Sequence, residues 1–116
     1  MQVGHEGLMT LARKVHAAAS DKDAVRLEQA ARHLLDALRT HIEDEAVAMI
    51  HLSPPDARTL VQGQARLSAA VEALIADAAR GCSGPPRRCV NRAEELLAFL
   101  VLQARDEHLA GCDRAA

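Results

Sequence analysis

Apolar residues recur every three or four positions along four segments of the chain, which is the spacing of one buried face of an α-helix. Short polar or Gly/Pro-rich stretches separate these segments. The pattern predicts helices over about 3–19, 23–51, 55–80 and 87–110. Because short connections make successive long helices antiparallel, we expect residues 1–116 to form one all-α domain, an up-down-up-down antiparallel four-helix bundle.

The breaks between the segments have the chemistry of helix ends. The first break, "SDKD", offers Asp21 or Asp23 as an N-cap for the second helix. The second, "SPPD", places prolines where one helix must stop and the next can begin. The third, "GCSGPP", combines two glycines with two prolines and is the firmest of the three.

Polar residues interrupt the apolar face of each predicted helix. In chain order they are His5, then His41 and Glu45, then Gln64, then Gln103 and Glu107. Counting residues from the turns at about 1.5 Å rise each places the first polar residue of every helix level with its neighbours to within roughly 3 Å. Glu45 and Glu107 follow His41 and Gln103 by four residues, so each lies one turn further along the same face. We therefore expect a layer of polar side chains inside the bundle.

A buried carboxylate without a partner is costly, so two of them in one layer need either a cation or a proton. A lone interior His or Gln is more often a hydrogen-bonded core residue than a ligand. The alternative for Glu45 and Glu107 is a solvated position at the mouth of the bundle, because Glu107 lies close to the predicted end of its helix. The coincidence of six such positions in one layer nevertheless favours a metal site. Its candidate residues are His5, His41, Glu45, Gln64, Gln103 and Glu107.

At these positions the chain resembles the hemerythrin-like, or HHE cation-binding, domains. That family is a four-helix bundle with a His on helix 1, H-x-x-x-E on helix 2, a His on helix 3 and H-x-x-x-E on helix 4, around a non-haem di-iron centre. Here "GHEGLM" supplies His5, "HIEDE" supplies His41 and Glu45, and "QARDEHL" supplies Glu107. The two remaining family imidazoles are replaced, by Gln64 in "GQARL" and by Gln103.

The resemblance implies a metal-binding protein, and the replacements limit what it binds. An amide oxygen is a poorer ligand for iron than a ring nitrogen. We therefore expect a non-haem metal site held by two His and one or two Glu side chains, with iron first, as a mononuclear or an incomplete di-iron site, and a single Zn or Mn next. The glutamines would then be hydrogen-bond partners or weak ligands.

The role implied by the resemblance is oxygen, redox or metal sensing or handling, with dioxygen or another small molecule as a further ligand. The alternative is a metal-free bundle that acts as a regulatory or interaction module, in which the Glu pKa values would be raised. An enzyme, a peroxidase or oxidase at the iron site, ranks third. Catalytic triads, phosphate-binding loops and Cys-x-x-Cys pairs are absent from the sequence, and it nominates no catalytic residue.

Composition and charge exclude other classes of partner. Trp and Tyr are absent, Phe99 is the single aromatic residue and the net charge is −2, which argues against a nucleic-acid-binding module. No window approaches the roughly 18 apolar residues of a membrane span, and "MQVGHEGLMTLARK" lacks the apolar centre of a signal peptide. We expect a cytoplasmic protein without a membrane partner, while a protein partner or a homo-oligomer stays open.

The remaining histidines are expected outside the layer. His33 is displaced about 80° around the helix from His41 and should lie on the surface. His108 should lie at a solvated helix end, and the alternative is that it replaces the missing ligand of the fourth helix if that helix is locally rotated or frayed. The basic run "PPRRCVNR" opposes the dipole of the fourth helix and is expected to be a solvated loop or a partner contact.

The three cysteines cannot share one metal site. Cys82 and Cys89 flank the third break, whereas Cys112 follows the fourth helix at the opposite end of the bundle. We expect free thiols, with a Cys82–Cys89 disulfide as the alternative under oxidation.

Overall fold

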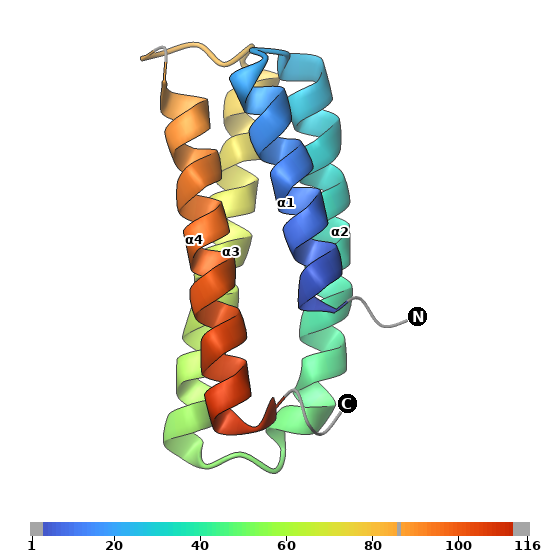
Figure 1. The fold of residues 1–116 in the computed structure, drawn as a ribbon, viewed down its shortest axis with the longest axis vertical. Coiled ribbons are helices and arrows are strands. Elements are labelled where there is room, and N and C mark those ends of the chain that lie inside the picture. The colour runs from blue at the N-terminus through green and yellow to red at the C-terminus, as the bar shows by residue number, and fades with distance from the viewer. Residues whose placement is uncertain (1–3, 86, 113–116) are drawn as a thin grey trace.

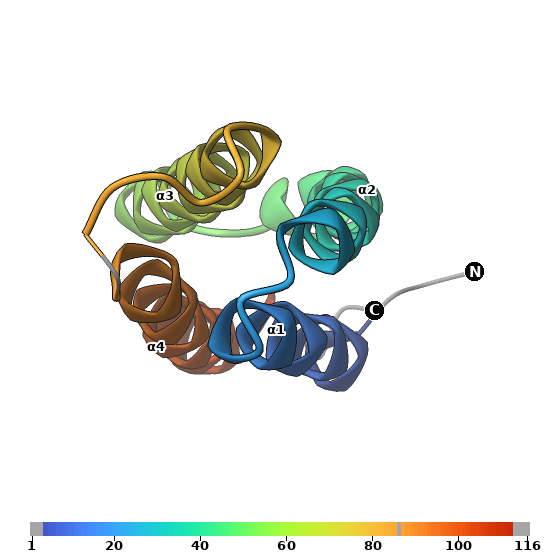
Figure 2. The same ribbon diagram turned by 90° about the horizontal axis from the view of Figure 1, so that it is seen from above.

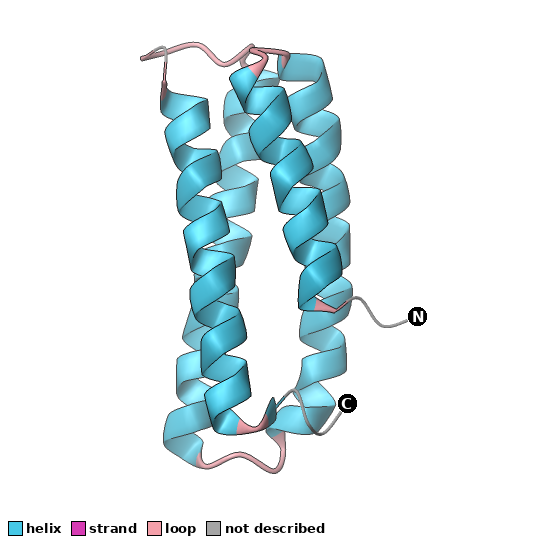
Figure 3. Ribbon diagram, in the orientation of Figure 1, coloured by secondary structure: helices cyan, strands magenta, loops and turns pink. Residues whose placement is uncertain are grey.

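The computed structural model describes residues 4–85 and 87–112, which form four helices and contain no strand (Figures 1 and 3). The helices are α1 (His5–Ser20), α2 (Ala24–Met49), α3 (Pro54–Ala79) and α4 (Arg88–Ala110). Successive helices run antiparallel, and each contacts its two neighbours around the bundle, with α4 closing on α1 (Figure 2). The predicted all-α four-helix bundle is confirmed.

The ends of the helices follow local sequence chemistry. At the start of α2, the Asp23 side chain accepts a hydrogen bond from the backbone N–H of Arg26, so Asp23 rather than Asp21 is the N-cap. Ser53 caps α3 in the same way, and Pro54 follows it as the first helical residue. These caps fix where the second and third helices begin.

The core runs along the bundle axis and consists mostly of leucine. The following leucines are buried almost completely: Leu8, Leu27, Leu34, Leu38, Leu60, Leu67, Leu74 and Leu96. Each contributes about 1.5–3 kcal/mol relative to an exposed side chain. All of them lie at apolar positions of the predicted helix faces, so these faces are the ones that meet.

Helix α1 is shorter than the others, with 16 residues against 26, 26 and 23. Its first residue, His5, lies part-way along the bundle, and α2, α3 and α4 continue beyond it (Figure 1). This start brings His5 to the height of the polar residues of α2 and α4. None of the described helices is long and apolar enough to cross a membrane.

Candidate metal centre

Four of the six predicted site residues converge in the interior of the bundle. His5 comes from α1, His41 and Glu45 from α2, and Glu107 from α4. One ligating atom of each lies within 4.8 Å of the corresponding atoms of the others. His41 and Glu45 are one helical turn apart on the buried side of α2, which is why a single helix supplies both.

Glu107 lies between the two imidazole rings. Its Oε2 is 2.7 Å from His5 Nε2, and its Oε1 is 3.1 Å from His41 Nε2. The same nitrogen of His41 is 3.3 Å from Glu45 Oε1. The two rings meet edge to face, with their centroids 4.7 Å apart. Each oxygen of Glu107 therefore faces a different imidazole.

The site is enclosed, most tightly around its carboxylates. The Glu107 and Glu45 side chains are 3% and 7% exposed, His41 is 12% exposed and His5 is 28% exposed. Burial acts to raise the pKa of Glu107, but the hydrogen bond with His41 and the close contact and charge interaction with His5 outweigh it, and the pKa is lowered. Glu107 is thus held as a charged carboxylate.

Several ligating atoms in this cluster lack a hydrogen-bond partner within the described part of the chain. They are both ring nitrogens of His5, Oε2 of Glu45 and Oε2 of Glu107. His5 Nε2 and Glu107 Oε2 are close, but their contact does not have the direction of an N–H···O hydrogen bond. Buried polar atoms without partners are uncommon in folded proteins. All of these atoms are of types that bind metal ions.

Gln64 supports Glu45 from α3. Its Nε2 donates a hydrogen bond of 3.0 Å to Glu45 Oε1 and also lies 3.6 Å from the sulfur of Met49. The bond engages one oxygen of Glu45 and leaves Oε2 without a partner. Gln64 therefore has the geometry of a hydrogen-bond partner to a ligand, which is one of the two roles expected for it.

Gln103 is buried as the pattern predicted, but its amide binds the backbone of α3. Its Nε2 donates to the carbonyl oxygen of Leu60 at 3.1 Å. The side chain lies directly against Gly63, where an added Cβ would come within 1.7 Å of Gln103 Oε1. Sequence reasoning missed Gly63 and the Leu60 carbonyl, although a glycine inside a helix signals a close approach.

The histidines expected outside the layer do lie outside it. His33 and His108 are both exposed. His16 contacts Glu94 on α4, with 3.6 Å between His16 Nε2 and Glu94 Oε1. None of these residues belongs to the cluster.

The basic run is a solvated loop only in part: Arg87 is exposed before α4, whereas Arg88 and Arg92 on α4 pair with a buried acid. Asp77, on α3, is 1% exposed, and its Oδ2 is 2.9 Å from Arg92 Nη1 and 3.7 Å from Arg88 Nε. Arg80 contacts the other oxygen at 2.8 Å. The sequence supplies the charges, but nothing in it shows that this aspartate is buried opposite them.

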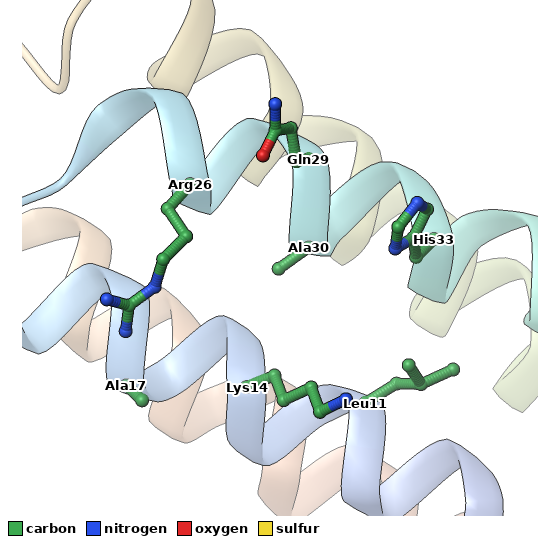
Figure 4. A pocket seen from close by; sticks show the side chains of 7 residues that line it. All are labelled: Leu11, Lys14, Ala17, Arg26, Gln29, Ala30 and His33. Atoms are coloured by element: carbon green, nitrogen blue, oxygen red, sulfur yellow. The ribbon is translucent and has the colours of Figure 1, made fainter.

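A groove of about 270 Å³ lies between α1 and α2 (Figure 4). Its lining residues are Leu11, Lys14, Ala17, Arg26, Gln29, Ala30 and His33. No residue of the His/Glu cluster lines it, so the groove is a separate feature from the candidate metal centre.

Comparison of the chain with protein-family models, with characterised proteins and with solved structures gives no significant match.

Proposed function

We propose that the bundle holds one non-haem divalent metal ion through His5, His41, Glu45 and Glu107, in the manner of a hemerythrin-like domain. The observation that carries the proposal is the convergence of these four side chains, with ligating atoms that lack hydrogen-bond partners among the described residues. A cation at their centre would give those atoms a partner.

Charge supports a divalent ion. Two carboxylates bring a charge of −2 to a site whose imidazoles bind metal in their neutral form, and a divalent cation balances that charge. Bonds of about 2.1 Å place ligand atoms about 3–4 Å apart. The corresponding distances here begin at 2.7 Å and stay within 4.8 Å, so small side-chain shifts suffice. Two imidazoles with carboxylates suit Fe(II), and also Mn(II) and Zn(II).

A single ion fits this chain better than a pair. The amide of Gln64 is engaged with Glu45, and that of Gln103 with the backbone of α3. The family that the chain resembles has two further imidazoles at these positions, whereas here both glutamine side chains make contacts within the protein.

We propose a role in oxygen, redox or metal sensing or handling. In this role His5, the most exposed of the four candidate ligands, lies on the side open to a small ligand.

The alternative is a metal-free bundle that acts as a regulatory or interaction module. It is favoured by the contacts of Glu107 with two imidazoles, which stabilise its charge without an ion. That version predicts raised Glu pKa values, however, whereas the pKa of Glu107 is lowered. The lowering comes from the two imidazoles, so a charged Glu107 is compatible with either version.

Elemental analysis of the purified protein and of its His41→Ala variant tests the proposal. We expect the wild type to take up about one ion of iron, manganese or zinc per chain, and the variant to lose at least about tenfold in affinity, since it lacks a ligand. His33→Ala, on the exposed side of the same helix, is the matched control and should bind like the wild type. Equal metal content in the wild type and His41→Ala would overturn the assignment, and a wild type without metal would favour the interaction module.

A further inference from the structure

An excess of positive charge lies toward the end of the bundle where α3 connects to α4, remote from the candidate metal centre (Figure 1). Three arginine side chains, those of Arg80, Arg88 and Arg92, contact the single carboxylate of Asp77. Three positive charges against one negative charge leave this arginine cluster at +2. The whole chain carries a net charge of −2, so the excess is local. Among the described residues, none of the three arginines forms an ion pair with another acid.

Asp77 holds the three guanidinium groups from the inside of the bundle. Its side chain is 1% exposed, whereas those of Arg80, Arg88 and Arg92 are 59%, 41% and 33% exposed. Each guanidinium group therefore turns one side to the buried acid and another to solvent. Arg88 and Arg92 lie one helical turn apart on α4, and both contact the same oxygen of Asp77, Oδ2. Their guanidinium groups are thus held next to each other at the surface.

The N–H donors of Arg88 and Arg92 remain available to a ligand. Only Arg80 donates an aligned hydrogen bond to Asp77, from Nη2 to Oδ1 at 2.8 Å. The contacts of Arg88 and Arg92 with Oδ2 are ion pairs that lack the direction of a hydrogen bond. Each guanidinium group carries five N–H donors in a planar fork, and no hydrogen-bond acceptor for those of Arg88 and Arg92 lies among the described residues. Cationic donors without acceptors, held in place by a buried acid, favour an anionic ligand.

The surroundings of the cluster add positive charge. Helix α4 begins at Arg88, and the amino-terminal end of a helix attracts anions. The first turn of α4 contains no acidic residue, and the exposed Arg87 precedes it. Gly84, in the connection before α4, borders the cluster, since a Cβ there would lie 3.4 Å from Arg88 Nη1. Nothing in this first turn competes with a bound anion for the arginines.

We propose that Arg88 and Arg92, with Arg80 beside them, bind a phosphate group on their solvent side, as inorganic phosphate or as a small phosphate monoester. Guanidinium forks match the oxygen atoms of phosphate. A phosphate group carries a charge of about −1.5 to −2 at neutral pH, which balances the excess of the cluster, whereas a single carboxylate does not. Nucleic acid is disfavoured as the source of the phosphate, because Phe99 is the single aromatic residue and the net charge is −2.

The site does not depend on metal binding. Glu107 lies on the same helix as Arg92, and the helical rise between residues 92 and 107 separates their backbones by roughly 22 Å. A phosphate group bound by all three arginines would link the end of α3, through Arg80, to the start of α4. Its binding should therefore persist in a chain that has lost the metal ligand His41.

Titration calorimetry of the purified full-length protein with inorganic phosphate, at an ionic strength kept constant with sodium chloride, tests the proposal. We expect saturable binding of about one phosphate per wild-type chain. Arg88→Gln and Arg92→Gln should each weaken it by about 10–100-fold, since each removes hydrogen bonds to a charged group. Arg88→Lys keeps the charge but loses the fork, so its affinity should lie between those of the wild type and Arg88→Gln.

Two control variants locate the binding. Arg39→Gln changes the net charge equally but removes an exposed arginine of α2, and it should bind phosphate like the wild type. His41→Ala should do so as well, which separates this site from the candidate metal centre, where an ion could also bind phosphate. Circular dichroism establishes that each variant keeps its helices.

A parallel titration with glycerol phosphate distinguishes the two sources of the phosphate group. Tighter binding than that of inorganic phosphate would support a monoester as the ligand, and weaker binding would support the free ion. The proposal is overturned if the wild type shows no saturable binding at constant ionic strength, or if Arg88→Gln and Arg92→Gln bind as tightly as Arg39→Gln. Loss of phosphate binding in His41→Ala would also overturn it, because the phosphate would then lie at the metal centre.

Discussion

At the residue scale, Gln64 contacts one of the four candidate ligands of the proposed metal centre. The hydrogen bond from its amide engages Glu45 Oε1 and holds that carboxylate in one orientation. Residues that orient a ligand commonly account for 10–100-fold in metal affinity. Gln64 is therefore a positioning residue in the proposed site.

We predict that Gln64→Ala lowers metal affinity by about 10–100-fold without abolishing binding. Glu45 would then lose its fixed orientation and would have to be ordered when the ion binds. Competition with a coloured chelator measures the change. Gln62→Ala removes an exposed glutamine from the same helix and is the matched control. An affinity that Gln64→Ala leaves unaltered would show that Glu45 needs no support from α3.

The sequence predicted which residues converge better than it predicted how they contact one another. His41 and Glu45 are found by their spacing of four, and His5 and Glu107 by counting residues from the turns, because helical rise is regular. Side-chain direction has no such rule. The amide of Gln103 could point toward the layer or toward α3, and only the packed structure shows that it binds the α3 backbone.

At the scale of elements, the contact between α3 and α4 depends on a residue without a side chain. Gly63 lets the Gln103 amide approach α3 and donate to the Leu60 carbonyl. Glycine inside a helix costs about 1 kcal/mol relative to alanine. Its presence here indicates that the close packing of the two helices outweighs this cost.

We predict that Gly63→Ala destabilises the protein by about 1–3 kcal/mol, although alanine is the better helix former. The new methyl group would displace the Gln103 side chain and break its buried hydrogen bond. Urea unfolding measures the loss. In a Gln103→Ala background the side chain that the new methyl group would meet is absent. Gly63→Ala should then be neutral or stabilising by up to about 1 kcal/mol. Equal effects in both backgrounds would contradict this account.

The sequence predicted the helices and turns well because each has a local cause. Apolar spacing marks the buried faces, and Asp23 and Ser53 mark helix starts. The basic run at the start of α4 was predicted to be a solvated loop or a partner contact, because arginines at a helix start oppose the helix dipole, which is a local effect. The pairing of Arg88 and Arg92 with Asp77 depends instead on how α3 and α4 pack together. Contacts between elements are the part that local patterns do not contain.

At the scale of the whole molecule, the bundle holds two polar clusters separated by a leucine core. The His/Glu cluster joins α1, α2 and α4 toward one end, while Asp77 and its arginines join α3 to α4 at the other. A metal ion would therefore link α1, α2 and α4 to one another, whereas the Asp77 cluster links only α3 and α4. Its effect on stability should be global.

We predict that removing the metal with a chelator lowers the melting temperature of the wild type by about 5–15 °C when the ion had been present at about 100 times its dissociation constant. The ion binds the folded chain and stabilises it by mass action. Differential scanning calorimetry with and without chelator measures the shift. The His41→Ala variant, which lacks a ligand and binds the ion more weakly, should show a clearly smaller shift, and an insensitive wild type would contradict metal binding.

The position of His5 at the start of α1 would couple ion binding to fraying of the first turn of this helix. Helix α1 begins at His5, and Gly4 before it makes no side-chain capping hydrogen bond. A bound ion held by His5 would tie the first turn of α1 to α2 and α4. The ion would then leave when this turn frays, so its residence time should follow the rate at which α1 unwinds from its start. The start of α1, at His5, would thus be the place where the ion enters and leaves the site.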